Sequence, residues 1–509
     1  MQEGFYGYQY KIGGESMIND IRDWIKRVEE IGELKRVKGE VDWDQELTAI
    51  DYLIGKSSQS PSLLFEKIKG YPPGYRVLSN FPGPSLNRVA LTLNIPIGLS
   101  AIELIKEIRI RYKKRIPPVE IPKEKASVNE NIILGKDVDV TKFPAPKTFP
   151  LDGGRYIGTA DVIITRDPET GYLNLGTYRN MILDKDKIGF YVSPGKDALI
   201  HREKWWKMGK PCEVAAIYGM NPLLYAVASQ SFPKNVSEYE YAGGIRDKAI
   251  EVFKGEVTDL LLPAGAEIIL EGLSYPGKTM KEGPFAEFPG YYARPAEETP
   301  YIEIKCIHHR NDPILTVAPM SDHNSGNATM QCLMRSAKIW DDLEAIGVPG
   351  IKGVYSHPFA IFGLVVVSIE QLYPGHSSQV LALAAQCTGG AYYTKWIIVV
   401  DEDVDPSDLN QVFWAMSTRC NPVDDIDILR NTWSTYLDPT RNPPEERPYG
   451  SKALINACKE HKYLKTFAKT TRLDEGVYRK VCSRWKELEL PGEPPKVEIF
   501  EKGTSIIGE

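Results

Sequence analysis

Two glutamates lie five residues apart in a loop of glycine, proline and aromatic residues, KEGPFAEFPGY at positions 281–291. A strand would point Glu282 and Glu287 to opposite faces, and a helix would hold them roughly 140° apart. The intervening Gly283-Pro284 pair allows the chain to fold back, so that both carboxyl groups can point into one pocket. The neighbouring phenylalanines would raise the pKa of a carboxyl group there, which suits a general acid near neutral pH. The loop alone leaves open the alternative of a surface turn with two solvated glutamates.

The composition is typical of a globular protein and gives no sign of nucleic-acid or membrane binding. Of the 509 residues, 42% are hydrophobic and 26% are charged, and the net charge is −6. The charge is not basic and no apolar run approaches the roughly 20 residues of a membrane span, so we expect neither nucleic acid nor membrane as a partner. The seven cysteines never form a CxxC pair, which favours reduced thiols and a cytoplasmic location.

The elements that must position the loop follow from hydrophobic periodicity, and the chain is too long for one hydrophobic core. Residues 1–16 are rich in glycine and tyrosine without periodicity and are interpreted as a flexible extension. Residues 17–125 alternate helix and strand patterns, with helices predicted from Met17 to Gly32, over 47–55 and around 97–115. This pattern predicts a small N-terminal α/β domain.

The middle of the chain changes to short apolar runs bounded by Gly, Pro, Asp and Asn, which are typical of β-strands. We predict a β-rich domain over 126–326, with strands within 155–167, 172–183, 188–193, 211–219, 223–229, 249–273 and 299–319. A linker helix over 327–345, a C-terminal α/β domain over 346–470 and a helix with a tail over 471–509 are expected to follow. The tail is of the kind that docks on a partner subunit, with a solvated helix as the alternative.

Three stretches resemble the UbiD family of decarboxylases: NLGTYR at 174–179, VSEYEYAGG at 236–244 and EGPFAEFPGY at 282–291. The resemblance covers nearly all of residues 17–490. Members of this family use prenylated FMN, made by a partner flavin prenyltransferase, to decarboxylate aromatic or α,β-unsaturated acids, and some run in reverse as carboxylases. The resemblance implies an N-terminal α/β domain, a central split β-barrel like that of flavin reductases, which holds the cofactor, and a C-terminal α/β domain used in oligomerisation. A homodimer or homohexamer is expected.

Decarboxylation leaves an electron pair on carbon, and no side chain in this sequence can act as the electron sink, so a cofactor is required. The sequence has neither a strand followed by GxGxxG nor a Walker loop, which leaves metal-bridged binding of a flavin phosphate. The resemblance makes Asn174 and Glu238 ligands of a divalent metal, Mn2+ or alternatively Fe2+ or Mg2+, with K+ beside Glu238. Asp197 aligns with a histidine of some relatives and is expected to be the third ligand. This difference leaves open which metal is preferred and whether Lys196 contacts the phosphate.

The resemblance also pairs Arg179 with Glu282. A guanidinium offers a rigid bidentate fork that keeps this carboxylate ionised, whereas Glu287, in a more apolar setting, can donate a proton to the carbon that loses CO2. Which glutamate is the final donor stays open, because a coupled pair shares its titration.

The remaining candidates are assigned less directly. Thr177, Tyr178 and Lys196 are expected to bind the cofactor together with Asn174, Arg179, Asp197 and Glu238. His323, in the SDHNSG loop before the linker helix, is a candidate for the substrate pocket. His308 and His309 follow a strand and are interpreted as edge residues without a role.

Three other functions are compatible with parts of this pattern. A split barrel also carries NAD(P)H-dependent flavin oxidoreductases, which need no arginine and paired glutamates. A scaffold that has lost its cofactor is disfavoured by the complete set of candidate residues. A substrate presented as an aromatic coenzyme A thioester remains an alternative to the free aromatic acid.

Overall fold

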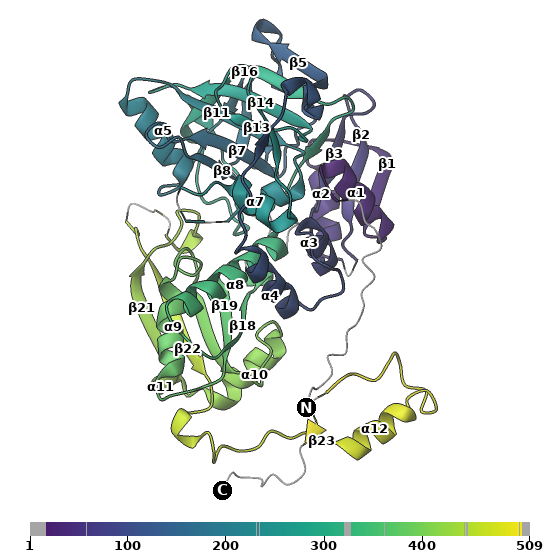
Figure 1. The fold of residues 1–509 in the computed structure, drawn as a ribbon, viewed down its shortest axis with the longest axis vertical. Coiled ribbons are helices and arrows are strands. Elements are labelled where there is room, and N and C mark those ends of the chain that lie inside the picture. The colour runs from purple at the N-terminus through teal and green to yellow at the C-terminus, as the bar shows by residue number, and fades with distance from the viewer. Residues whose placement is uncertain are drawn as a thin grey trace.

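The computed structural model describes residues 17–500 except 58, 231, 234, 320–326, 361, 442, 444–445 and 498. The predicted extension over residues 1–16 and the end of the tail, 501–509, lie outside the described residues. Figure 1 shows an N-terminal part in purple, a large central sheet in teal, a C-terminal part in green and a yellow tail set apart from them. The fold class is the predicted one, a mixed α/β protein with a curled half-barrel sheet at its centre.

The N-terminal domain is built on a four-stranded sheet in the order β1-β2-β3-β17. Helix α1 begins after an Asp20 cap that accepts a hydrogen bond from the Asp23 amide, and it ends before Gly32, whose φ is +76°. The predicted helices are confirmed as α1, α2 and α4. The elements are α1 (Ile21–Glu30), β1 (Leu34–Val41), α2 (Glu46–Gly55), β2 (Ser62–Ile68), β3 (Arg76–Ser79), α3 (Leu86–Thr92) and α4 (Ala101–Arg111), with β17 (Ile314–Thr316).

The central domain is a ten-stranded sheet in the order β6-β9-β10-β16-β14-β11-β7-β8, and β15 and β5 both pair with β16. Alternate residues fill its concave interior, among them Ile163, Val214 and Ile302, because successive strand residues face opposite sides. The strands are β5 (Asn131–Leu134), β6 (Tyr156–Gly158), β7 (Asp161–Arg166), β8 (Leu173–Gly176), β9 (Asn180–Asp184), β10 (Lys187–Gly189), β11 (Cys212–Tyr218), β14 (Ile268–Ser274), β15 (Thr279–Glu282) and β16 (Glu297–His309).

A small sheet and three helices complete the central domain. The sheet has the order β13-β12-β4. Its strands are β4 (Val119–Glu120), β12 (Glu251–Lys254) and β13 (Leu261–Pro263), and the helices are α5 (Asp197–Lys207), α6 (Pro222–Ala228) and α7 (Glu238–Arg246).

The strand predicted over 223–229 is wrong, because this segment forms helix α6. The side chain of Asn221 caps the helix by accepting a hydrogen bond from the Leu223 amide at 2.9 Å, and Pro222 occupies the first turn. All residues of α6 are buried, so the apolar run has no polar face that would reveal a helical period.

The C-terminal domain is a five-stranded sheet in the order β18-β19-β20-β22-β21. Helix α8, the predicted linker helix, contacts both α4 and β18 and thereby joins the first and last domains. The elements are α8 (Ala328–Ala345), β18 (Ile351–Ser356), β19 (Leu364–Ile369), α9 (His376–Gln386), β20 (Trp396–Asp401), α10 (Leu409–Arg419), α11 (Pro422–Asp425), β21 (Ile426–Thr432) and β22 (Gly450–Ala457).

The tail carries β23 (Leu473–Asp474), α12 (Glu475–Ser483) and β24 (Ile499–Phe500), with β23 parallel to β24. In Figure 1 the tail lies away from the three domains, as expected for a projecting segment. Among the described residues, every helix is too short or too polar to cross a membrane.

Candidate active site

The glutamate loop leaves the central sheet at the end of β15. Glu282 is the last residue of that strand, and Gly283 follows with φ +90°, a left-handed conformation that glycine adopts without strain. The loop then turns back, with the Glu287 amide donating to the Tyr291 carbonyl at 3.0 Å. Both carboxyl groups are buried, since the exposed fractions of Glu282 and Glu287 are 1% and 7%. A solvated surface turn is therefore excluded.

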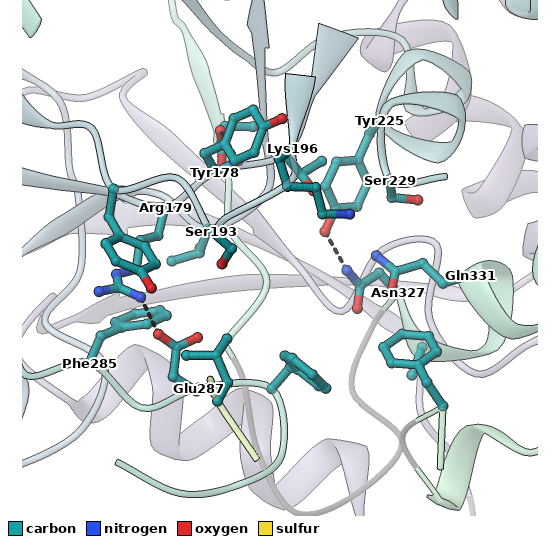
Figure 2. Close-up of a pocket in the computed structure, with 18 of the residues that line it drawn as sticks. Tyr178, Arg179, Ser193, Lys196, Tyr225, Ser229, Phe285, Glu287, Asn327 and Gln331 are labelled. Atoms are coloured by element: carbon teal, nitrogen blue, oxygen red, sulfur yellow. Dashed lines mark hydrogen bonds and ion pairs between the residues drawn. The ribbon is translucent and has the colours of Figure 1, made fainter. Parts of the chain in front are cut away.

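Arg179 contacts both glutamates from the segment between β8 and β9. Its Nε and Nη2 atoms donate to the two oxygens of Glu282 at 3.1 and 3.0 Å, and its Nη1 donates to Glu287 Oε1. The guanidinium lies over the ring of Tyr191, with 4.4 Å between Cζ and the ring centroid. Figure 2 shows Arg179 and Glu287 facing each other at one wall of the cavity. The structure thus brings together the three residues expected to do the chemistry.

The two glutamates differ in their surroundings. Burial raises the pKa of Glu287, which the Arg179 guanidinium opposes and the neighbouring Glu282 carboxylate reinforces. Glu282 instead faces two N–H groups of Arg179 and the hydroxyl of Tyr156, whose oxygen lies 3.0 Å from Glu282 Oε1. Burial therefore favours the protonated form of Glu287 over that of a solvated glutamate.

The residues expected to bind metal meet at the edge of the sheet. Asn174 lies on β8, Asp197 is the first residue of α5 and Glu238 is the first residue of α7. The amide of Leu175, next to Asn174, donates to Glu238 Oε2 at 2.8 Å. Burial raises the pKa of Glu238 to about 8, and the nearby Asp197 carboxylate adds to this shift.

This donor set fits a hard divalent cation. A buried carboxylate beside a second acidic group is costly without a positive charge. Asparagine and carboxylate oxygens suit Mg2+, Mn2+ or Fe2+ rather than a soft metal.

A cavity of about 240 Å³ lies between the central sheet and the C-terminal domain. Thr177, Tyr178, Arg179, Lys196 and Glu287 line it together with Tyr191, Phe285, Phe288, Gln331 and Tyr392. Lys196 reaches into it in Figure 2, and burial lowers the pKa of this lysine. A second cavity of about 160 Å³ shares Lys196, Phe288, Gln331 and Tyr392 with the first. The candidate His323 lies outside the described residues.

Family models match this chain along most of its length. They are described as the N-terminal, Rift-related and C-terminal domains of 3-octaprenyl-4-hydroxybenzoate carboxy-lyase and match residues 25–109, 119–322 and 328–457. A phenolic acid decarboxylase of Sedimentibacter hydroxybenzoicus is 34% identical over 438 residues, which are 84% of this chain and 89% of the relative. The chain belongs to the UbiD family.

Two solved structures resemble this UbiD-family protein over most of both chains. The closed form of the Sedimentibacter hydroxybenzoicus vanillic acid decarboxylase has a TM-score of 0.82 at 31% identity, covering 93% of this chain and 99% of the other. An evolved dimeric form of the UbiD-class enzyme HmfF from Pelotomaculum thermopropionicum, in complex with prFMN, has a TM-score of 0.77 at 26% identity, covering 89% and 97%. The enzyme class is therefore the predicted one, a UbiD-type carboxy-lyase.

Sequence reasoning missed two polar residues of this UbiD-family site. Tyr156 on β6 and Asp161 on β7 are buried in strands whose neighbours are apolar, so neither residue carries a motif. Asp161 lines the cavity, and its Oδ2 accepts a hydrogen bond from the Tyr178 amide at 3.3 Å. Burial raises the pKa of Asp161 to about 8.

The interpretation of His308 as an edge residue is wrong. Its exposed fraction is 1%, and its Nε2 lies 2.6 Å from Glu271 Oε1 and 3.3 Å from Cys306 Sγ. The Glu271 carboxylate also accepts the amides of Glu256 and Thr258 at 2.8 and 3.0 Å. Since β16 lies inside the sheet between β10 and β14, this cluster fastens the 256–258 turn to the sheet. Its carboxylate is occupied by hydrogen-bond donors, which is the arrangement of a structural contact.

Proposed function

We propose that this UbiD-family protein catalyses the reversible, non-oxidative decarboxylation of an aromatic carboxylic acid with prenylated FMN. The observation that carries the proposal is the convergence of Glu282 and Glu287 on Arg179, with Arg179 and Glu287 lining the cavity. The relative named as a phenolic acid decarboxylase supports an aromatic acid, and the relative with prFMN supports the cofactor. Hydroxybenzoic acids are the first substrates to test.

The cofactor, when bound, supplies the electron sink for the electrons that the departing CO2 leaves behind. Asn174, Asp197 and Glu238 would hold a divalent metal, Mn2+ or alternatively Fe2+ or Mg2+, that neutralises its phosphate, with K+ beside Glu238. Thr177, Tyr178 and Lys196 would contact the cofactor from the cavity wall. Asn174 is positioned by β8, Lys196 and Asp197 by the start of α5, and Glu238 by the start of α7.

The acid and base roles divide between the glutamates. Arg179 keeps Glu282 in place as a carboxylate through two hydrogen bonds, and Glu287 delivers the proton to the carbon that has lost CO2. The aromatic side chains of the cavity would shield the reacting carbon of the substrate from water.

The proposed function also requires a supply of the cofactor and involves a homo-oligomeric assembly. A flavin prenyltransferase of the same cell would provide prenylated FMN, and the protein would act in the cytoplasm as a homodimer or homohexamer. The proposed domains are 17–125, 126–326, the linker helix 327–345, 346–470 and the tail 471–509. His323 stays a proposed substrate contact.

Coexpression with a flavin prenyltransferase and anaerobic purification test the proposal. Mass spectrometry of the released cofactor should find prenylated FMN, and the holoenzyme should release CO2 from one of a panel of benzoic, hydroxybenzoic, heteroaromatic and cinnamic acids. Labelled bicarbonate added with the product should appear in the acid. Unmodified FMN alone, together with NAD(P)H-driven flavin reduction, would replace this function with that of an oxidoreductase.

A further inference from the structure

The segment from Asp152 to Tyr156 lies directly against the glutamate loop. Tyr156 is fully buried, and its hydroxyl donates to Glu282 Oε1 at 3.0 Å. The Pro284 carbonyl lies 3.3 Å from the same hydroxyl, but a hydroxyl has one hydrogen and a carboxylate is the stronger acceptor. The Tyr156 ring also packs on Phe285, with 4.3 Å between the ring centroids.

The backbone of the same segment fixes the turn between the two glutamates. The Gly153 amide donates to the Pro284 carbonyl at 2.8 Å, and Asp152 Oδ1 accepts the Ala286 amide at 2.9 Å. Asp152 Oδ2 is itself held by the Phe149 amide at 2.9 Å. The Tyr156 hydroxyl therefore meets Glu282 at a fixed position, because both sides of the contact are held by separate hydrogen bonds.

This contact makes the two glutamates unequal. Three donors face the Glu282 carboxylate, namely Nε and Nη2 of Arg179 and the hydroxyl of Tyr156. Glu287 receives Nη1 of Arg179. Hydrogen bonds to a carboxylate favour its ionised form, and Glu287 accepts fewer of them than Glu282, so Glu287 is the better placed of the two to hold a transferable proton.

We propose that Tyr156 is a positioning residue of the reaction, whose hydroxyl holds Glu282 as the partner of Arg179 and so leaves the transferable proton on Glu287. The inference rests on the proposed function for its catalytic consequence. The contact itself is independent of that function, because it is made within the protein alone.

Tyr156→Phe removes the hydroxyl and keeps the ring that packs on Phe285. We expect kcat to fall about tenfold, the value of one hydrogen bond to a charged group, with KM and cofactor occupancy unchanged. Tyr239→Phe is the matched control: Tyr239 is equally buried and donates to the Leu261 carbonyl at 3.0 Å, away from the glutamate loop. This control should retain the wild-type kcat.

A double-mutant cycle separates positioning from packing. In a Glu282→Gln background, Tyr156→Phe should cause little further loss of kcat, because the hydroxyl acts through the carboxylate. The unfolding temperatures of the cofactor-free proteins give a second readout of the same cycle. Tyr156→Phe alone should lower the unfolding temperature by about 2 °C, and it should lower it by less in the Glu282→Gln background.

If the effects of Tyr156→Phe and Glu282→Gln were additive both in kcat and in unfolding temperature, Tyr156 would contribute through packing alone. The inference would then be wrong. If no acid is decarboxylated by the wild type, the proposed function fails, but the unfolding cycle still decides whether Tyr156 and Glu282 are coupled. A coupled unfolding cycle with unchanged kcat in Tyr156→Phe would also contradict the catalytic role.

Discussion

At the scale of single residues, the environment decides which of two chemically identical side chains is suited to the proposed role of the acid. Glu282 is surrounded by donors that suit a carboxylate, whereas Glu287 lies where burial raises its pKa. The sequence indicates this difference only in part, because Lys281 and Gly283 flank Glu282 whereas Ala286 and Phe288 flank Glu287. The rest arises from Tyr156 on β6 and from Arg179, between β8 and β9, which are both distant from the glutamate loop in the sequence.

Glu287→Gln keeps the shape of the side chain and removes its transferable proton. The variant should bind cofactor normally and lose at least about 100-fold in kcat, the size of a lost general acid. Glu298→Gln, on the exposed face of the adjoining strand, is the control and should retain activity. Wild-type product formed in D2O should carry deuterium at the carbon that held the carboxylate. If Glu287→Gln decarboxylated its substrate at the wild-type rate, another residue would have to be the proton donor. His323 would be the next residue to substitute.

The proposed metal ligands give a second prediction. Asn174→Ala or Glu238→Ala should lose both divalent metal and cofactor while the protein stays folded, because the phosphate charge is then uncompensated. Asp197→Ala should lose less, because its carboxylate stands where some relatives have a different ligand. Metal analysis and flavin absorbance of the purified proteins measure both losses. Full cofactor occupancy in Glu238→Ala would contradict the metal assignment.

The buried carboxyl group of Asp161 should make the stability of the folded protein depend on pH. Burial raises its pKa from 3.8 to about 8, so between these values the folded protein keeps a proton that the unfolded chain has released. The contribution of this group to stability is therefore present below pH 3.8 and is lost as the pH rises to about 8. Asp161→Asn does not titrate, so its stability relative to wild type should rise with pH by at most about 1.4 kcal/mol per unit. Thermal unfolding of the cofactor-free proteins across this range measures the difference, and a constant difference would show that Asp161 is ionised throughout.

At the scale of elements, close approach of two turns fixes the distance between the glutamates. A Cβ at Gly153 would lie 1.9 Å from the Gly283 carbonyl oxygen, so a side chain at this position must displace the turn. Gly153 lies before β6 and Gly283 follows β15, so the two turns come from segments far apart in the sequence.

Gly153→Ala should therefore disturb catalysis more than folding. We expect the variant to lose at least about tenfold in kcat with the fold intact, because displacement of the turn changes the geometry of Glu282 and Glu287. Gly171→Ala is a control for the loss of a glycine, since its position is open, although its φ of +75° makes a small loss of stability expected. Equal activity of Gly153→Ala and wild type would contradict the role of this contact.

The elements also show how far the sequence can be interpreted. Amphipathic helices such as α1 and α4 were predictable because one face of each is polar. Helix α6 was not, because it is buried on all sides and its seven residues carry no polar period. The site residues that carry a motif were found, whereas Tyr156 and Asp161 lack one and become polar contacts only when strands from different parts of the chain are placed together.

At the scale of the whole molecule, the cavity lies between domains and the tail lies outside them. Exposed apolar side chains on the tail include Leu473 and Val477, at 52% and 55% exposed, and the C-terminal domain exposes Phe413 on α10. These side chains would be available for the contact with a second copy that is proposed for the tail.

Removal of the tail tests this arrangement. A chain ending at residue 470 should keep the central cavity and form smaller assemblies than the full chain, because the tail's apolar contacts with a second copy are lost. Light scattering during gel filtration measures the mass, and flavin absorbance serves as the control for an intact cofactor site. An unchanged mass of the assembly would show that the tail is a solvated arm that makes no contact with a second copy.

The sheet of the N-terminal domain includes a strand that is synthesised much later than its other strands. Strand β17, at Ile314–Thr316, pairs in parallel with β3, whose other neighbour β2 belongs to the first domain. During synthesis, the edge of β3 therefore stays open until the whole central sheet has emerged, and an open edge is a template for pairing with other chains. The order of translation thus leaves this edge of the nascent N-terminal domain exposed, and ties completion of its sheet to synthesis of the central domain.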